Sequence, residues 1–500
     1  LSTLLNKYCK FLPVPIVFGK KQEWKDGAYV DTDEDNQIND VHPAWTKKPS
    51  ELKDEDYIAF YHQLYPQTFE EPLFWIHLNV DYPFNLTGIL YFPKVKNQME
   101  LQRNKIQLYA NQVFVTEDVE GIVPEYLTLL HGVIDSPDIP LNVSRSYLQS
   151  DAQVKKISNH ISKKVADRLD ELFRNERSLF EEKWESLKVF VQYGMLSDEK
   201  FYDRAVKFDL VTDIDGKHFT LDEYRTLTEG EQTDKEGQLV WLYTNDRNSQ
   251  YTAIERAKAK GYSVLLLDGP LDVHAVSQLE QKLEKTRFVR VDSDSIDKLI
   301  AKDEQRAVSL SDVEQKALKA LFEGRLPREE KRNYSVSLEA LGADADAVLI
   351  TQGEFMRRMQ EMARLQPGMN FYGELPEGYN VVLNTEHPLI QRLLASEKEV
   401  VEPKLSTLRA ELQEQSELVE AARTVQSAKK PEEVSVAERE ELDALTSKQA
   451  ELEGKISEEI KKFGAEELLV GQLVDLALLG NGLLSGEALA AFIRRSQQLL

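Results

Sequence analysis

The spacing of apolar residues changes along the chain and separates stretches that favour strands from stretches that favour helices. From residue 74 to 115, short alternating or continuous apolar runs predict strands at 74–80, 87–92, 106–109 and 113–115. A helix is predicted before them, at 50–65, with Tyr57, Phe60, Tyr61 and Leu64 on one face. Strands with helices before and after them indicate a segment in which helices pack against a sheet.

A long amphipathic helix is predicted after residue 150. Apolar residues recur there at spacings of three and four, at Val154, Ile157, Ile161, Val165, Leu169 and Leu172. The other face carries Lys155, Lys156, Lys163, Lys164 and Arg168. We prefer to interpret this basic face as a solvated surface and keep a binding patch as the alternative.

A strand–helix–strand pattern follows at 239–267. It predicts a second α/β segment with parallel pairing. Asp268 and Asp272 come directly after its last strand, at the end where active sites of such folds lie. No glycine-rich phosphate loop accompanies them, so helix capping is the preferred role.

The last part of the chain is predicted to be mostly helical. Phe355, Met356, Met359 and Met362 share one helix face, which fits a core face or, because methionine is flexible, a surface that contacts varied protein partners. Both interpretations stay open. The Glu- and Lys-rich insert at 397–462 predicts an antiparallel helical hairpin, with a break near Lys430.

The two terminal helices are too apolar to cover each other. We therefore expect a homodimer in which this face packs against its two-fold mate. The residues predicted at the dimer contact are Leu468, Leu469, Leu473, Leu476, Leu479, Phe492 and Ile493.

The predicted fold class is thus a multidomain α/β (α+β) protein with a mostly helical C-terminal part. We expect a large α/β segment at 1–150, a helical linker region at 151–205 and a small α/β segment at 206–305. A C-terminal dimerisation domain at 306–500 would contain the insert 397–462.

Composition narrows the class of protein. The 500 residues are 41% hydrophobic, enough for real cores, and carry a net charge of −24, which disfavours nucleic-acid binding. Cys9 is the single cysteine, so no intrachain disulfide can form, and we expect a cytoplasmic protein. No apolar run approaches about 18 residues and no signal peptide precedes the first strand, so no membrane association is predicted.

Familiar catalytic motifs are missing from the sequence. It has no Walker-type phosphate loop, no HExxH, no GxSxG and no paired CxxC, and its eight histidines lack metal-ligand spacing, so no metal site is predicted. The acidic tract at 31–40 lacks the glycine and the glutamate of a calcium loop, and a solvated hairpin loop is preferred. His131 is interpreted as a packing residue at a helix end. What remains is Arg145, a long cation on the loop before the amphipathic helix.

The residues around Arg145, IPLNVSRSYLQ, resemble the signature of the heat-shock protein 90 chaperones. Other segments resemble the family in the same order: HPAWTKKPS at 42–50, the strands at 74–80 and 106–115, and LLLDGPLD at 265–272. The bacterial branch is the most similar, because the chain stops at Leu500 without an acidic pentapeptide tail.

The resemblance implies a middle domain and a C-terminal dimerisation domain. It also implies that the family's N-terminal ATP-binding domain is missing, in agreement with the absent initiator methionine. In the family, the arginine of the SR pair reaches the ATP γ-phosphate and a glutamine four residues later assists; those positions are Arg145 and Gln149. ATP and Mg²⁺ would be bound by the missing domain. Ser146 replaces the family's usual glutamate, and the insert 397–462 is not a general family feature.

The resemblance therefore predicts part of an ATP-dependent chaperone that binds unfolded or partly folded clients, and no ATP turnover by this fragment alone. Trp45, expected to be exposed, and Phe355, Met356, Met359 and Met362 are the predicted client contacts. The alternative is a non-enzymatic dimeric scaffold or holdase that uses the same surfaces. An independent enzyme centred on Asp268 and Asp272 is the third interpretation.

Overall fold

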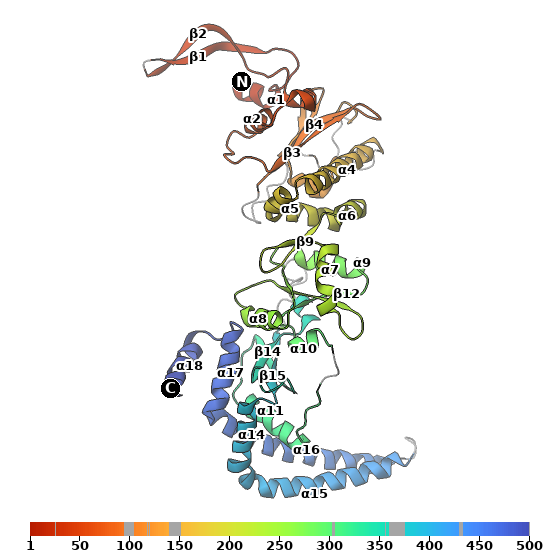
Figure 1. Cartoon of the computed structure of the whole chain (residues 1–500), viewed down its shortest axis with the longest axis vertical. Helices are drawn as coiled ribbons and strands as arrows, with labels where there is room; N and C mark the ends of the chain where they lie inside the picture. Colours follow the sequence, from red (N-terminus) through yellow and green to blue (C-terminus); the bar gives the residue numbers. More distant parts are fainter. Residues whose placement is uncertain are drawn as a thin grey trace. The chain divides into compact units, whose positions relative to one another are not determined.

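The structure of the chain is a computed structural model. It describes residues 1–25, 27–94, 105–117, 119, 121–139, 152–302, 306–355, 357–359, 376–429 and 434–499. The contacts within these ranges separate two compact units. Unit 1 holds Leu1–Thr212, Lys217–Tyr224 and Gly269–Leu279, and unit 2 holds Asp213–Gly216, Arg225–Asp268 and Glu280–Leu500. The predicted mixed α+β class is confirmed (Figure 1), whereas the division into four domains stays a prediction.

Unit 1 is built on a mixed sheet. Its described strands lie in the order β3-β4-β7-β5-β6, with β5 and β7 parallel and the other neighbours antiparallel. The strands are β3 (Phe74–Val80), β4 (Leu86–Phe92), β5 (Lys105–Ala110), β6 (Val113–Thr116) and β7 (His131–Asp135). The central strand β7 is buried at every residue, as expected for a strand covered on both faces.

Short helices and an aromatic core cover one side of this sheet. The helical elements there are α1 (Ser2–Tyr8), η1 (Ala44–Thr46), η2 (Pro49–Glu51) and α2 (Asp54–Leu64), whereas η3 (Glu125–Leu129) packs on the helix Arg177–Ser197. The predicted face of α2 is confirmed, since Tyr57, Phe60, Tyr61 and Leu64 are all buried. They pack with Trp45 and Phe11 against residues of β4, β5 and β7.

The helices α4 (Ala152–Asn175), α5 (Arg177–Ser197) and α6 (Glu199–Ala205) complete the main body of unit 1. The six apolar residues predicted on the inner face of α4 are all buried. Tyr126 joins these helices to η3: its hydroxyl lies 2.6 Å from Ser162 Oγ, and its ring packs on Phe201. The strand pair β8 (Leu210–Thr212) and β9 (His218–Thr220) follows.

The acidic tract at 31–40 is not a loop, and that expectation is wrong. It lies mainly in β2 (Ala28–Gln37), which pairs with β1 (Val17–Lys25) in an exposed antiparallel ribbon. Cross-strand ion pairs explain why acids are tolerated in this strand: Lys20 contacts Asp35 at 2.8 Å and Lys21 contacts Glu34 at 2.7 Å.

Unit 2 begins with the predicted parallel strand–helix–strand arrangement. β10 (Leu239–Thr244) pairs in parallel with both β11 (Val264–Leu266) and β12 (Thr286–Arg290). The helix α8 (Tyr251–Ala259) ends before Gly261, whose φ of 77° suits glycine at a helix end. The remaining helices of this stretch are α7 (Leu221–Gln232), α9 (Asp272–Lys282) and α10 (Ile296–Leu299), and residues of α7 and α9 are divided between the two units.

A second small sheet and several helices form the rest of unit 2. The described strands β13 (Arg332–Glu339), β15 (Glu377–Asn384) and β14 (Val348–Thr351) lie side by side in that order. The helices are α11 (Asp312–Glu323), α14 (Pro388–Val400), α15 (Glu402–Ser427), α16 (Val436–Glu466), α17 (Leu468–Gly480) and α18 (Gly486–Leu499). One apolar core joins these helices to the sheet.

The insert forms the predicted antiparallel helical hairpin. Gln415 on α15 donates to the carbonyl of Leu445 on α16, and Gln426 further along α15 donates to the carbonyl of Glu438, nearer the start of α16. The two helices are therefore antiparallel. Figure 1 shows α15 and α16 running next to each other. Leu405, Val419, Leu452 and Ile456 are buried, in agreement with the two predicted apolar seams.

Candidate functional site

The stretch that contains Arg145 begins at a strand end with fixed hydrogen bonds. Asp135, the last residue of β7, is buried; its Oδ2 accepts from Trp45 Nε1 at 3.1 Å and from the amide of Gln112 at 2.9 Å. Ser136 Oγ donates to the carbonyl of Asn85 at 2.6 Å. These bonds hold the end of β7 to elements far away in sequence.

The stretch ends at a helix that is equally well anchored. α4 buries Val154 and Ile157 in its first turns, so its start is packed in place. Arg145 and Gln149 themselves lie outside the described residues. The described geometry is therefore that of two fixed ends, the buried strand β7 and the packed inner face of α4. The predicted catalytic residues come between these ends in the sequence.

The outer face of α4 is basic, as predicted. Lys155, Lys156, Lys163 and Lys164 are exposed, and Arg168 pairs with Glu171 at 2.8 Å. Burial and the nearby charges of Lys164 and Lys163 lower the pKa of His160, so protonation adds little to the positive charge of this face near neutral pH.

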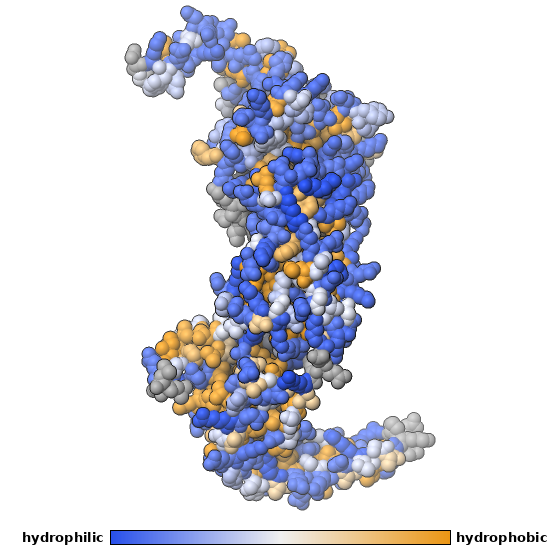
Figure 2. Space-filling view, in the orientation of Figure 1, coloured by the Kyte–Doolittle hydropathy of each residue, from blue (hydrophilic) through white to orange (hydrophobic). Residues whose placement is uncertain are grey.

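The C-terminal helices expose apolar side chains together. Leu468, Leu476, Leu479 and Ile493 have exposed fractions of 55%, 54%, 39% and 48%. Figure 2 shows hydrophobic surface gathered over α17 and α18. The two helices are fastened to each other by an ion pair between Arg495 and Asp475 and by a 2.8 Å hydrogen bond from Gln472 to Ser496 Oγ. We call the four exposed residues the terminal apolar face.

Two of the seven residues predicted at the dimer contact are buried within their own unit, and a third is partly covered. Leu473 and Phe492 lie in the core of unit 2, at 7% and 9% exposure, and Leu469 packs partly against that core. The expected placement of Leu473 and Phe492 at a dimer contact is therefore wrong. For Leu473 the reason is geometric, because α17 is apolar on nearly all sides and periodicity does not tell its inner face from its outer one. Phe492 lies on the apolar side of the amphipathic α18, which packs into the core of unit 2.

Comparison with known proteins identifies the family. The model of the family described as "Hsp90 protein" matches residues 3–463. The chain belongs to the heat-shock protein 90 family. A protein of Porphyromonas gingivalis named "Chaperone protein HtpG" is 67% identical over all 500 residues, and one of Bacteroides fragilis with the same printed name is 56% identical over the same length. The chain covers 73% of each of these two relatives.

A more distant relative shares the name. The "Chaperone protein HtpG" of Halalkalibacterium halodurans is 30% identical over 389 residues, which are 73% of this chain and 59% of the relative. The predicted resemblance to the bacterial branch of the heat-shock protein 90 family is therefore confirmed.

One predicted contact residue of this family member is not on its surface. Trp45 is fully buried, and the expectation that it is exposed is wrong. Its ring packs against Phe11, Phe60 and Tyr109 with centroids 4.8, 5.5 and 5.2 Å away, and its indole N–H holds Asp135. The burial of a tryptophan together with a hydrogen-bond partner for its N–H is typical of a structural residue.

The methionine-rich helix is described only at its start. Phe355 is 75% exposed and Met359 is half-buried, whereas Met356 and Met362 lie outside the described residues. The start is anchored by ion pairs: Arg357 contacts Glu354 at 2.6 Å, and Arg358 contacts Glu280 at 2.7 Å.

The charge of Glu354 helps to hold the start of this helix in place. Burial favours the neutral form of Glu354, but the charges of Arg357 and Arg358 outweigh it and lower the pKa of this carboxyl. Arg357 also donates to Tyr243 on β10 at 2.7 Å. Phe355 is thus presented to solvent from a fixed base.

Of the two aspartates after β11, Asp268 is exposed and Asp272 has structural surroundings. Asp272 is buried and accepts from Lys188 at 2.8 Å, from Gln192 at 2.7 Å and from the amide of Gly269 at 2.7 Å. No group of three or more metal-ligating side chains is found among the described residues. Asp272 is therefore occupied in fixing the start of α9, and the interpretation as an independent enzyme gains no support.

Sequence reasoning placed His131 wrongly and missed Asp135. His131 lies in β7, not at a helix end, and its Nδ1 is 2.9 Å from the Tyr61 hydroxyl. Asp135 was missed because its partners Trp45 and Gln112 are 90 and 23 residues away, and no local pattern signals such a pair. In the part of the chain that the structure describes, no helix is long and apolar enough to cross a membrane.

Proposed function

We propose that this chain is the middle and C-terminal part of an ATP-dependent chaperone that binds and remodels non-native proteins in the cytoplasm. The observation that carries this proposal is the 67% identity, over the whole chain, to a protein named "Chaperone protein HtpG". The chain makes up 73% of that relative's length, which leaves room there for a further domain. We assign ATP and Mg²⁺ binding to that further domain.

Within this chain, Arg145 is the proposed catalytic residue and Gln149 its assistant. An arginine that contacts the γ-phosphate stabilises the charge that develops as the phosphoryl group is transferred. Because it comes from a separate domain, hydrolysis would require that the two domains close on each other. The fixed ends of the arginine stretch, at Asp135 and at the start of α4, support this role, since they limit where the side chain can reach.

Replacement of Arg145 by alanine in the full-length protein tests this role. ATP turnover should fall at least about 100-fold, while the Kd for ATP changes less than about threefold, because the arginine acts mainly in the transition state. Arg145→Lys should recover part of the activity, and replacement of the exposed Arg247 by alanine should change neither quantity. An equal loss of affinity and turnover would contradict the role, as would any substantial turnover by residues 1–500 alone.

We further propose that the terminal apolar face forms a homodimer. Leu468, Leu476, Leu479 and Ile493 are exposed together, and an isologous contact would bury all four against their symmetry mates. Leu476→Asp should raise the dimer Kd at least about 100-fold in sedimentation, because it would bury a carboxylate without a partner. Leu418→Asp, at a 49% exposed position on α15, is the matched control. A monomeric wild-type chain at micromolar concentration would contradict the proposal.

The client contact is proposed at the anchored start of the methionine-rich helix, through Phe355 and Met359 together with Met356 and Met362. The 75% exposure of Phe355 supports it, because a single large apolar side chain held out from a rigid base can enter a partner's core. A photo-crosslinker at position 355 should capture an unfolded model protein at least five times more than one at the exposed position 418. Equal capture at both positions would contradict this contact.

A non-enzymatic holdase is the second candidate, favoured by the same exposed Phe355. The two differ in their dependence on ATP. If the protein only holds clients, the Arg145→Ala form will suppress aggregation and release clients as the wild type does. If ATP drives remodelling, the variant will still bind clients but will fail to release them.

A further inference from the structure

A cavity of about 500 Å³ lies within unit 2, and none of its lining residues belongs to the arginine stretch or to the terminal apolar face. One wall is formed by Lys260 and Tyr262, which follow α8, and by residues of α10. The opposite wall is the end of β13 and the residues after it, from Leu338 to Leu341. Its volume lies within the range of about 300–1,000 Å³ that is usual for small-molecule sites.

The lining of this cavity combines an apolar floor with cationic walls. Ile300 is buried, and Val308, Leu338 and Leu341 are partly buried beside it. The cationic lining residues among those described are Lys260, Lys298, Lys302 and Arg306, against the carboxylates of Asp297 and Glu339. The lining therefore carries four cationic and two anionic side chains, in a chain whose net charge is −24.

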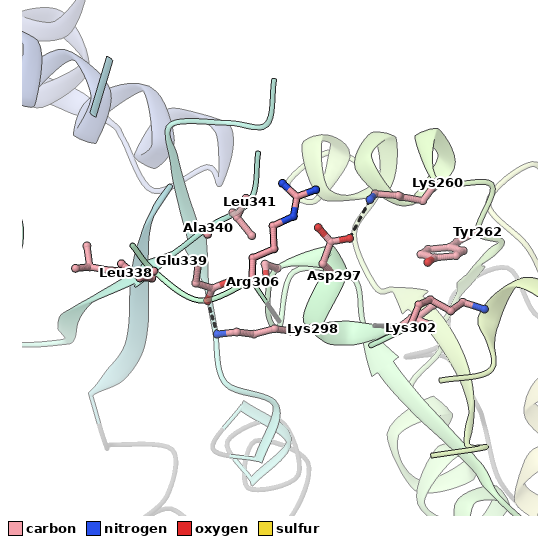
Figure 3. Close-up of a pocket in the computed structure, with 13 residues that line it drawn as sticks. Lys260, Tyr262, Asp297, Lys298, Lys302, Arg306, Leu338, Glu339, Ala340 and Leu341 are labelled. Carbon is pink, nitrogen blue, oxygen red and sulfur yellow. Dashed lines mark hydrogen bonds and ion pairs between the residues drawn. The ribbon is translucent and has the colours of Figure 1, made fainter. Parts of the chain in front are cut away.

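The two carboxylates already have partners. Lys260 donates to Asp297 at 2.9 Å, and Glu339 accepts from Ser295 at 2.9 Å and pairs with Lys298. Figure 3 shows both ion pairs. The lysines of these pairs are therefore neutralised by carboxylates of the lining. The other two cations, Arg306 and Lys302, form no ion pair with a described carboxylate of the lining, and the acidic contact of Arg306 is Glu386, outside the lining.

Of these two cations, Arg306 is the better placed. Its guanidinium lies close to Gly342, directly after the wall residue Leu341, with Nη1 3.8 Å from the point that a Cβ of Gly342 would occupy. Its acidic contact is Glu386 at 3.3 Å, with side chains 69% and 38% exposed, and such an exposed pair is weak. In Figure 3 the Lys302 amine points away from Arg306. The planar guanidinium can bind a carboxylate through two parallel hydrogen bonds.

A second cavity adjoins the first. It has a volume of about 380 Å³ and shares Lys260, Ser295, Asp297 and Leu341 with the first. Beyond the shared wall its lining is mixed, with apolar Ala253, Ile296, Leu349 and Ile350 and acidic Asp292, Asp294, Asp344 and Asp346. These acids disfavour an anion there, so a ligand with its anionic group at Arg306 would place its organic body on the apolar residues of the first cavity.

We propose that this cavity binds a small organic anion, a carboxylate attached to an aromatic or aliphatic body, with Arg306 as the charge partner. Polyanions such as nucleic acid are disfavoured, because the chain as a whole is strongly acidic and one arginine cannot balance many phosphates. The site is independent of the proposed ATP-dependent function, because none of its residues belongs to the arginine stretch or to the terminal apolar face.

Binding of 2-naphthoxyacetate to the 500-residue chain tests the proposal, by isothermal titration and saturation-transfer NMR up to about 5 mM, since ligands of this size bind weakly. Arg306→Glu should raise the Kd at least tenfold, and Arg306→Lys should raise it less. The neutral analogue 2-(2-naphthyloxy)ethanol should bind at least tenfold more weakly than the acid.

Two variants separate this site from other surfaces. Lys404→Glu reverses an exposed charge on α15 outside the cavity, and Leu476→Asp alters the terminal apolar face; both should leave the Kd within twofold of the wild type. Ala340→Trp, which would fill the cavity, should abolish binding even if Arg306→Glu unfolds the chain. The proposal is overturned if no binding occurs up to 5 mM, if both cavity variants bind normally, or if acid and neutral analogue bind equally.

Discussion

A close contact between two helices of unit 2 depends on a glycine, and replacement of this glycine tests the packing. Gly464 lies near the end of α16, where that helix crosses α11. A Cβ added at Gly464 would lie 2.1 Å from the carbonyl oxygen of Leu321 and 2.8 Å from its carbonyl carbon. Both of these are backbone atoms, so no side chain can rotate away to make room.

The magnitude follows from that distance. An ordinary contact needs more than 3 Å, so α11 and α16 would have to separate by about 1 Å. The separation would loosen contacts of Leu321, Phe322 and Ile460, all of which are buried in the same core. Overpacking of this kind costs about 1–3 kcal/mol, against a gain of at most about 1 kcal/mol from replacing glycine by alanine within a helix. We expect Gly464→Ala to destabilise unit 2 by roughly 1–2 kcal/mol.

Gly454 provides a matched control on the same helix. It is exposed, and a Cβ added there would meet nothing within 4 Å. Gly454→Ala should therefore stabilise unit 2 by about 0.5–1 kcal/mol through helix propensity alone. Calorimetric unfolding of both variants measures the difference, with opposite shifts of the transition that contains α16. If Gly464→Ala raises that transition as Gly454→Ala does, the close crossing of α11 and α16 is refuted.

The remaining predictions concern unit 1. Burial, aided by Asp272 and opposed by Lys188, raises the pKa of Asp209 to about 7, so the folded state holds a proton that the unfolded state has lost. The free energy of unfolding should therefore fall as the pH rises from about 4 to 7. Urea unfolding at pH 5 and pH 8 measures this loss, and Asp209→Asn should remove roughly 2–4 kcal/mol of it. An unchanged pH profile in the variant would contradict this. Trp45→Phe removes a buried N–H donor to Asp135 and leaves a void. The free energy of unfolding of unit 1 should fall by about 2–4 kcal/mol, and the backbone amides of β7 should exchange hydrogen faster. An unaltered exchange pattern would show that Trp45 does not hold this strand.

Much of the fold could be predicted from local sequence because it depends on local periodicity. The strands β3 and β4, the inner face of α4 and the seams of the helical hairpin were predicted close to their observed positions. In each case the inner face is apolar and the outer face is polar, so the helix or strand has one way to bury its surface. The arginine stretch was recognised from its motif, and in the sequence it comes between β7 and α4, outside the described residues.

The errors occur where the deciding partner is distant or where the pattern has no polar face. The acidic tract became a strand because lysines of β1 lie opposite its acids. Leu473 was assigned to the surface because α17 is apolar on nearly all sides, and Phe492 because the apolar side of α18 was expected to face a second copy of the chain. Only the packing of the sheet and helices of unit 2 decides which sides are covered.

The sequence by itself determined the family and the mixed α+β class. It also singled out Arg145, for which these residues contain no catalytic motif that could supply a partner. These features reside in residue identity and local spacing. The tertiary structure decided the burial of Trp45 against Asp135, the four-residue extent of the terminal apolar face and the cationic cavity at Arg306. Each of these features depends on contacts between residues that are distant in the chain, or on which face of a helix is covered. Both are fixed only when the helices and strands pack together.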